Sequence, residues 1–549
     1  MNGAEAFVAA LYAAGAKYVF GNPGTTEQAF LHAVSKHEGI EFVLCLHEAV
    51  AVGAAEGYTR VSGEVGVVQL HTGCGLGNSL GMLSNAFQGH TPLVIFVGGP
   101  SRKGMHSEPA LGGDLVGMAR PVSRWVWELR TADEIPIVVA RAFKVAKTNP
   151  AGPVVIVVPN DLMDEVCSVS IVKPSWVLSN VVVGGKLLDE VVERLCNAKS
   201  PALLFGDGIL NEKSGWSLAQ LAKCLAAPIY SSSVTHAVLP TNESLYAGEV
   251  PLFDAALARA QLSHHDLVLA IGVDLIRSVF PEPGPPLGEK EVIHIGLDPW
   301  QLGKNQPCTS ILGDECLTIE ALLSRFVGDT AINITKEGFE SRNARRKKLT
   351  TELNLLRAED KLRTSKVFKS PSLTPDRVIS ELSKLLPDDC IIIDESVSAM
   401  SAVTRWIDRQ PGRWYRSRGG GLGAGMSIPI GASLARPECR VVAIVGDGSS
   451  MYTVTAMWTA AHLKLPITWI VLDNGGYRIL EVNARLWHAG RDSTVPFVGT
   501  ALRNPSIDIA GIATAFGLTS LRVKNITELV QCVSVFSGGP KLVQITMSS

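Results

Sequence analysis

The sequence lacks the marks of a disulfide-rich, metal-stapled or membrane protein. Its ten cysteines are scattered singly through 549 residues, without a CxxC pair. This spacing argues against a disulfide scaffold or a structural zinc site and favours a reducing compartment, with the cytoplasm as the expected location. No apolar run reaches about 18 residues, so we predict no membrane span. The N-terminal stretch has no basic region, so we predict no signal peptide.

The sequence also lacks an excess of charge of either sign. Lysine and arginine together number 50 and nearly cancel 52 aspartates and glutamates, and charged residues make up 19% of the chain against 46% hydrophobic ones. This balance excludes a disordered tail protein and a general polyanion binder. Nucleic acid is therefore not an expected partner.

Glycine and proline, by contrast, are plentiful, with 52 and 30 residues. Because no repeat accounts for them, the glycines suggest many tight strand-to-helix turns, which are where α/β enzymes bind phosphates. At roughly 150 residues per domain, the length predicts three or four domains.

Short runs of branched apolar residues alternate with helical patterns along the whole chain, which is typical of parallel α/β layers. We predict three doubly wound α/β domains: an N-terminal one over 1–166, a middle one over 185–330 and a C-terminal one over 372–549. Residues 331–371 are rich in lysine, arginine and glutamate and are expected to form a solvated connecting helix. The expected strands are 18–20, 41–44, 65–70, 93–97, 154–158, 202–205, 267–271, 291–295, 390–393, 441–445, 468–472 and 542–545.

The strand over 441–445 runs into a Gly-Asp-Gly turn, and an apolar helical pattern over 451–463 follows. The next strand ends in Asn474, followed by Gly475 and Gly476. In a doubly wound sheet, one helix and one strand later is the adjacent strand end, so Asp447 and Asn474 should face a common point. A carboxylate, an amide oxygen and the carbonyl of Gly476 are hard oxygen ligands suited to Mg²⁺. The alternative is that Asp447 only caps a helix and Asn474 makes a turn.

This spacing resembles the fingerprint of the thiamine-diphosphate enzymes. The likeness extends through FGNPGTTEQAF, HEAVAVGAAEGYTR, HTGCGLGNSLGMLSNAFQGHTPL, DESVSAM and GGGLGAGMSIPIGASLA. It is greatest to the benzoylformate decarboxylases, with a further likeness to acetolactate synthase large subunits. The resemblance implies pyrimidine-binding, middle and diphosphate-binding domains, and thiamine diphosphate with Mg²⁺ as cofactors. It also implies that the cofactor lies between two chains, so that the protein is a dimer or tetramer.

The resemblance assigns roles to particular residues. Glu48 opens an apolar helix after the second strand and matches the carboxylate that activates the cofactor; its Ala- and Val-rich surroundings predict that it is largely desolvated. His71, at a strand end, and Thr25 match residues that contact the substrate. A packing role for His71 and a dipole contact for Glu48 are the alternatives. The residues expected around the cofactor are Ser398, Leu422, Gly446, Gly448, Ser449 and Tyr477, of which Leu422 would support the bent cofactor. The alternatives are a simple core role for Leu422 and capping roles for the hydroxyl side chains.

Two departures from the family pattern bear on the reaction. The second catalytic histidine of benzoylformate decarboxylase falls on Val279, and a substrate-facing phenylalanine falls on Asn483. A proton donor or base is therefore missing from its expected place. His106, His236 or His488 could substitute, although a lone loop histidine is more often a surface residue.

The leading hypothesis is a lyase that decarboxylates a 2-oxo acid and releases the acyl anion or transfers it to an aldehyde or ketone. An acetolactate-synthase-like carboligase and a 2-hydroxyacyl-CoA lyase are alternatives, although the C-terminal residues do not resemble the peroxisomal S-K-L signal. A non-catalytic, cofactor-binding regulatory paralogue is a further alternative, which the presence of Glu48, Asp447 and Asn474 disfavours.

Overall fold

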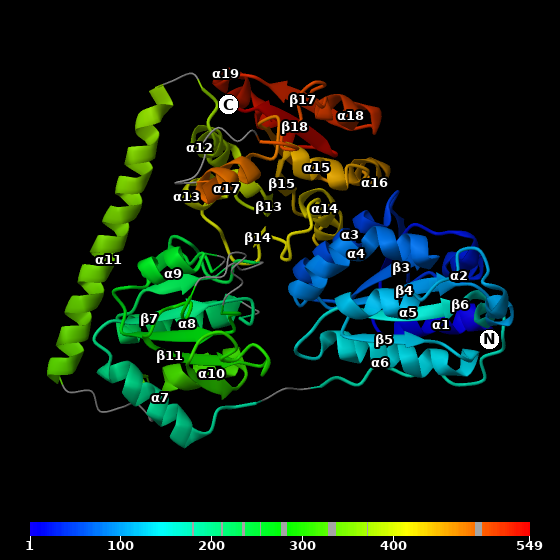
Figure 1. Ribbon diagram of the computed structural model, residues 1–549, viewed down its shortest axis with the longest axis horizontal. Helices are drawn as coiled ribbons and strands as arrows, with labels where there is room; N and C mark the ends of the chain where they lie inside the picture. The colour runs from blue at the N-terminus through cyan, green and yellow to red at the C-terminus, as the bar shows by residue number, and fades with distance from the viewer. Residues whose placement is uncertain are drawn as a thin grey trace. The chain divides into compact units, whose positions relative to one another are not determined.

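A computed structural model describes residues 1–177, 181–209, 212–232, 236–252, 254–275, 283–327, 336–369, 372–488 and 497–548. The chain forms two compact units. The first unit comprises Met1–Val177, Phe368–Ile407 and Tyr415–Ser549, and the second comprises Leu178–Val367 and Asp408–Trp414. The chain folds into three parallel six-stranded sheets with interleaved helices, as the alternation of apolar runs predicts (Figure 1).

The first sheet has the strand order β2-β1-β3-β4-β6-β5, and its strands are all parallel. Its central strands are buried on both faces because helices cover them. The strands are β1 (Tyr18–Gly21), β2 (Glu41–Leu44), β3 (Gly66–His71), β4 (Leu93–Gly99), β5 (Trp125–Glu128) and β6 (Val154–Pro159). The helices are α1 (Gly3–Ala13), α2 (Gln28–Ser35), α3 (Glu48–Ser62), α4 (Thr72–Gln88), α5 (Leu115–Ala119) and α6 (Ile135–Lys147).

The C-terminal part of the chain forms a sheet of order β14-β13-β15-β16-β18-β17, whose residues belong to the first unit except for Trp414. The strands are β13 (Ile391–Glu395), β14 (Trp414–Tyr415), β15 (Val441–Gly446), β16 (Ile467–Asp473), β17 (Thr519–Val523) and β18 (Lys541–Thr546). The helices are α12 (Pro375–Leu385), α13 (Met400–Trp406), α14 (Ala424–Ala435), α15 (Asp447–Tyr452), α16 (Ala456–His462), α17 (Arg478–His488), α18 (Ile509–Ala515) and α19 (Ile526–Val530).

The prediction of a single helix over 451–463 is wrong. The structure has two short helices there, α15 and α16, separated at residues 453–455. Thr453 explains the break, because its hydroxyl donates a hydrogen bond of 2.5 Å to the carbonyl of Gly423 on another loop. A long-range bond therefore overrides the local helical pattern.

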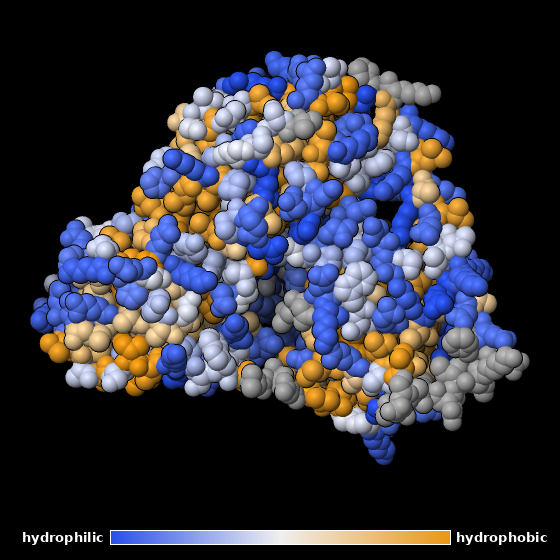
Figure 2. All heavy atoms as spheres, turned by 180° about the vertical axis from the view of Figure 1, so that it is seen from behind, coloured by the Kyte–Doolittle hydropathy of each residue, from blue (hydrophilic) through white to orange (hydrophobic). Residues whose placement is uncertain are grey.

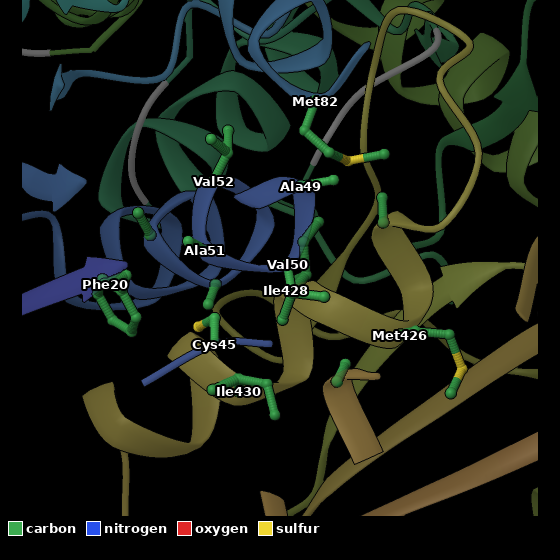
Figure 3. Close-up of a cluster of buried hydrophobic side chains, with 14 of the residues drawn as sticks. Phe20, Cys45, Ala49, Val50, Ala51, Val52, Met82, Met426, Ile428 and Ile430 are labelled. Atoms are coloured by element: carbon green, nitrogen blue, oxygen red, sulfur yellow. The ribbon is translucent and has the colours of Figure 1, made fainter. Parts of the chain in front are cut away.

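Helices α3 and α14 pack at very short range and join the two sheets of the first unit. A Cβ atom on Gly57 would lie 2.1 Å from the carbonyl oxygen of Ile428, and one on Gly431 would lie 1.7 Å from that of Ala54. Figure 3 shows Val50 of α3 beside Ile428 of α14, within a core that draws on both sheets. Glycine at these positions is what permits the close approach of the two backbones.

The second unit holds a sheet of order β12-β11-β10-β7-β8-β9. The charged segment forms a long helix, α11 (Lys336–Ser365). Arg345 and Arg357 of α11 donate hydrogen bonds to backbone carbonyls elsewhere in this unit. The other elements are β7 (Pro201–Phe205), β8 (Ile229–Ser231), β9 (Tyr246–Glu249), β10 (Leu267–Ile271), β11 (Glu291–Gly296), β12 (Thr309–Leu312), α7 (Gly185–Asn197), α8 (Glu212–Leu225), α9 (Ala255–Gln261) and α10 (Glu315–Ser324).

Among the described residues, no helix combines the length and the apolar character needed to cross a membrane. The longest, α11, has a markedly hydrophilic composition. The face of the molecule drawn in Figure 2 mixes hydrophilic and hydrophobic residues.

Candidate functional site

The structure brings the three predicted metal ligands together at the carboxyl edge of the C-terminal sheet. Asp447 follows β15 and Asn474 follows the adjacent strand β16. The Asp447 carboxylate accepts a hydrogen bond of 3.0 Å from the N–H of Gly476, and the Asn474 amide lies 3.4 Å from the hydroxyl of Ser398. These contacts link the ends of three neighbouring strands, β13, β15 and β16.

Asp447 is a buried carboxylate without a cationic partner among the ion pairs of the described residues. Burial raises its pKa to about 6, and the nearby charge of Asp473 acts in the same direction. A desolvated carboxylate of this kind is stabilised when a cation binds it. Within the described part of the chain, no three His, Cys, Asp or Glu side chains form a metal-binding cluster. A cation here therefore needs amide, backbone or ligand oxygens besides Asp447, which suits Mg²⁺.

The carbonyl oxygen of Gly476 remains able to bind a metal. The N–H of Gly476 already bonds Asp447, while its carbonyl accepts a hydrogen bond of 3.0 Å from the N–H of Arg478. A carbonyl oxygen has two lone pairs, so it retains one for a metal. Arg503, which no sequence motif singled out, donates a hydrogen bond of 2.9 Å to the carbonyl of Asn474.

The Gly-Asp-Gly turn is shaped by the aromatic ring of Tyr477. A Cβ atom on Gly448 would lie 2.5 Å from that ring, so a larger residue there would displace the ring. Gly446 ends β15, and Ser449 is buried in the first turn of α15. Backbone N–H groups at the start of a helix attract a phosphate. The expected diphosphate contacts Gly446, Gly448, Ser449 and Tyr477 thus lie around one turn.

Glu48 is the first residue of α3 and is 9% exposed, as its apolar neighbours predict. Its carboxylate accepts a hydrogen bond of 3.0 Å from the side-chain amide of Asn78 on α4. The preceding residue, His47, caps the helix by accepting a bond from the N–H of Ala49. Glu48 therefore has a fixed orientation at the carboxyl edge of the first sheet.

His71 lies at the end of β3 beside a buried carboxylate, Glu27, that the sequence motifs did not reveal. The His71 Nδ1 atom is 3.0 Å from Glu27, which also accepts a bond of 2.8 Å from the N–H of Gly24. Because an ionised carboxylate only accepts, Nδ1 must carry the proton and Nε2 is left for another partner. Glu27 is 2% exposed. The signal that could have found it is an acidic residue in a short turn between an apolar strand and a helix.

The residues around His71 come from the ends of three strands, β1, β3 and β4. A Cβ atom on Gly24 would lie 2.2 Å from the imidazole of His71, and one on Gly98 at the end of β4 would lie 1.7 Å from the carboxylate of Glu27. Thr72, directly after His71, is buried and has a φ of 49°. A β-branched residue in this region costs of order 1–3 kcal/mol, and such strain is concentrated at functional sites.

Thr25 begins the short turn that holds Glu27 and is exposed. Leu422 is partly buried in the loop before α14. Ser398 is exposed in the turn after β13. The hydrogen bonds of Glu48 and His71 stay within the first sheet and its helices, and those of Asp447 and Asn474 stay within the C-terminal sheet and its loops.

Three histidines could substitute for the missing catalytic histidine, and they lie in different parts of the chain. In the second unit, His236 lies 3.7 Å from Asp207 and 3.1 Å from the carbonyl of Ile209. His106 is exposed in a short 3₁₀ helix of the first unit. His488 ends α17, and Val279 lies outside the described residues.

Three models of the thiamine pyrophosphate enzymes match the chain: the N-terminal TPP binding domain at residues 1–118, the central domain at 188–322 and the C-terminal TPP binding domain at 397–545. Benzoylformate decarboxylase of Pseudomonas aeruginosa is 30% identical over 93% of this chain and 92% of its own. The acetolactate synthase large subunit of Haemophilus influenzae is 28% identical over 96% of this chain and 91% of its own. The thiamine diphosphate-dependent 4-hydroxybenzoylformate decarboxylase of Rhodococcus jostii RHA1 superposes with a TM-score of 0.85 at 26% identity, covering 100% of this chain and 99% of that one.

Proposed function

Because the chain belongs to the thiamine pyrophosphate enzyme family, we propose that it uses thiamine diphosphate and Mg²⁺ to decarboxylate a 2-oxo acid. The proposal is carried by two buried carboxylates, each at the carboxyl edge of a different sheet. Asp447 lies beside Asn474 and Gly476 on one sheet, and Glu48 lies beside Asn78 on the other. When bound, thiamine diphosphate supplies the carbon nucleophile and the electron sink that carbon-carbon cleavage needs.

Asp447, Asn474 and the Gly476 carbonyl would hold Mg²⁺. Gly446, Gly448, Ser449, Ser398 and Tyr477 would hold the diphosphate. The buried carboxylate of Asp447, which has no cationic partner among the described residues, and the glycine turn against the Tyr477 ring support this assignment. Leu422 would contact the cofactor between its two rings, and this role rests on the resemblance.

Glu48 would bind N1′ of the aminopyrimidine and hold a proton there. Its low exposure and its bond from Asn78 support this role, because a desolvated and oriented carboxylate binds a ring nitrogen in a defined geometry. Replacing it by glutamine keeps the shape and removes the proton-holding group.

His71 and Thr25 would contact the carboxylate and carbonyl of the 2-oxo acid. Glu27 is added to this set as the residue that fixes the proton on Nδ1 of His71. When Nε2 also carries a proton, it can donate a hydrogen bond to the carbonyl oxygen of the substrate, and in the neutral imidazole it can accept a proton.

The test is to offer the purified chain, with thiamine diphosphate and Mg²⁺, a panel of aromatic and aliphatic 2-oxo acids and to measure CO₂ release. We expect turnover of at least one acid, and a loss of roughly 100-fold or more in kcat for Glu48→Gln. Glu5→Gln is the matched control, since Glu5 is an exposed carboxylate that accepts the backbone N–H of Asn2 in the same unit. No turnover of any acid would refute the proposal and favour a regulatory paralogue. Turnover by Glu48→Gln equal to that of the parent would refute the proposed role of Glu48.

We further propose that Glu48 of one chain and Asp447 of a second chain act on the same cofactor, in a dimer or tetramer. This arrangement rests on the resemblance, which implies that the cofactor lies between two chains; Glu48 and Asp447 have their hydrogen-bond partners on different sheets. Co-expression of Glu48→Gln with Asp447→Ala tests it, because a mixed dimer would contain one intact site of two. Random pairing should restore about a quarter of parental activity. Activity no higher than that of either variant alone would place both residues in one chain's site.

Carbon-carbon ligation is the second candidate reaction. It is favoured by the valine at position 279, where the decarboxylase has a histidine that handles protons. A poorly protonated intermediate can be captured by a second carbonyl compound. Adding aldehydes to the same assay distinguishes the two reactions, because ligation yields a hydroxyketone in proportion to CO₂, whereas decarboxylation alone yields the free aldehyde.

A further inference from the structure

The loop that carries Leu422 is unusually rich in left-handed glycines. We call residues 419–423 the Leu422 loop; Gly419, Gly420 and Gly423 have φ values of 108°, 96° and 102°. Glycine gives such a loop many conformations in the absence of other constraints, so a defined position for Leu422 requires bonds from outside the loop.

The first external bond comes from Asn85 on α4, which is fully buried. Its Nδ2 donates a hydrogen bond of 2.7 Å to the carbonyl of Gly421, and its Oδ1 accepts one of 2.9 Å from the N–H of the same residue. A Cβ atom on Gly419 would lie 2.6 Å from Oδ1 of Asn85, so this side chain also packs against the start of the loop. One amide therefore fixes both backbone groups of the residue before Leu422.

The second external bond comes from Glu395 at the end of β13. Its two carboxylate oxygens accept hydrogen bonds of 2.9 Å each from the N–H groups of Gly423 and Gly425. Gly423 is the N-cap of α14 and has no side chain with which to cap it, so Glu395 supplies the cap from another element. Thr453 holds the carbonyl of Gly423 from a third direction.

Leu422 thus lies between two residues whose backbones are held by side chains from separate elements. We propose that Asn85 and Glu395 are positioning residues that set the place of Leu422 against the cofactor. This inference rests on the proposed function, because it takes Leu422 as a cofactor contact.

No conservative replacement of Asn85 or Glu395 keeps all of its hydrogen bonds to the loop. In Glu395→Gln the new NH₂ group would face one of these N–H donors, so one hydrogen bond is lost without a change in volume. In Asn85→Asp the acceptor for Gly421 N–H is kept and the donor to its carbonyl is lost.

The test is a set of double-mutant cycles in the purified protein: Asn85→Asp, Glu395→Gln and Leu422→Ala, alone and in pairs with Leu422→Ala. The readouts are kcat, KM and the dissociation constant of thiamine diphosphate in the presence of Mg²⁺, measured by calorimetry. We expect each of the first two variants to lower kcat about tenfold with KM changed less than about threefold, and to weaken cofactor binding. Each should add less than about twofold in the Leu422→Ala background, because it acts through Leu422.

Two control variants separate positioning from folding. Ser79→Ala removes a buried hydroxyl on α4 that donates a hydrogen bond to the carbonyl of Leu76, and Glu315→Gln alters a buried carboxyl in the second unit. Both should keep parental kcat. Unchanged kcat in Asn85→Asp and Glu395→Gln, or factors that persist in full in the Leu422→Ala background, would overturn the inference while the proposed function stands. A parent chain that binds no thiamine diphosphate would overturn both.

Discussion

Replacing Glu27 by glutamine should impair the reaction through His71 without unfolding the protein. Glu27 is buried and accepts from three donors: the N–H of Gly24, the hydroxyl of Thr26 and Nδ1 of His71. A glutamine has one acceptor oxygen, and its NH₂ group would meet a donor. The simplest rearrangement moves the His71 proton from Nδ1 to Nε2, so that the face left for a substrate changes from an acceptor to a donor.

The size of the effect follows from the charge-assisted hydrogen bond at 3.0 Å between His71 and Glu27. Hydrogen bonds to charged groups contribute about 1.5–3 kcal/mol, and about 1.4 kcal/mol corresponds to a tenfold change in rate. We therefore expect kcat to fall about 10- to 100-fold on the 2-oxo acid that the parent turns over fastest. His71→Ala should have a similar effect, and the double variant should be little worse than either single one.

Steady-state kinetics of the four proteins, with their urea unfolding curves, test this prediction. Glu5→Gln is again the control, since it alters an exposed carboxylate that accepts a backbone N–H. A Glu27→Gln variant within about threefold of parental kcat, or one whose loss adds fully to that of His71→Ala, would show that Glu27 does not act through His71.

Two further predictions concern stability. Gly431→Ala should lower the free energy of unfolding by about 1–3 kcal/mol, because its Cβ would lie 1.7 Å from the carbonyl oxygen of Ala54; Gly104→Ala, whose Cβ would meet nothing within 4 Å, should change it by less than about 0.5 kcal/mol in the same urea titration. Burial raises the pKa of Glu315 to about 7 from 4.5, so the folded state binds a proton that the unfolded state releases, and stability should fall as pH rises from about 4.5 to about 7. Glu315→Gln should remove about 3 kcal/mol of that fall, and equal pH profiles for the parent and Glu315→Gln would contradict the assignment.

The group formed by Asp447, Asn474 and Gly476 shows what local sequence can predict. Asp447 and Asn474 each follow a run of branched apolar residues, and parallel strands place their carboxyl ends at one edge. The prediction that they face a common point needed only the strand order along the chain. The burial of Glu48 was likewise predictable, because its neighbours on α3 are almost all alanine and valine.

Other features of the site depend on contacts between residues far apart in the sequence. Glu27 meets His71 across 44 positions, and Asn85 meets Gly421 across 336. Thr453 breaks the helix expected over 451–463 because it bonds Gly423, 30 positions away. No periodicity within a window of about 10 or 20 residues contains these partners, so such bonds become visible only when the sheets are assembled.

The dependence of the site on sheet register follows from the same geometry. Gly21 pairs with Gln69 between β1 and β3, and this register places the turn after β1 beside His71. A shift of one residue would move Glu27 by about 3.3 Å relative to the imidazole, more than the whole 3.0 Å bond, and would exchange the side chains that β1 packs into the cores on its two faces. The apolar core that fixes the register therefore also fixes the distance between Glu27 and His71. Core substitutions next to β1 should consequently change kcat together with stability, whereas equal losses of stability in the second unit should not.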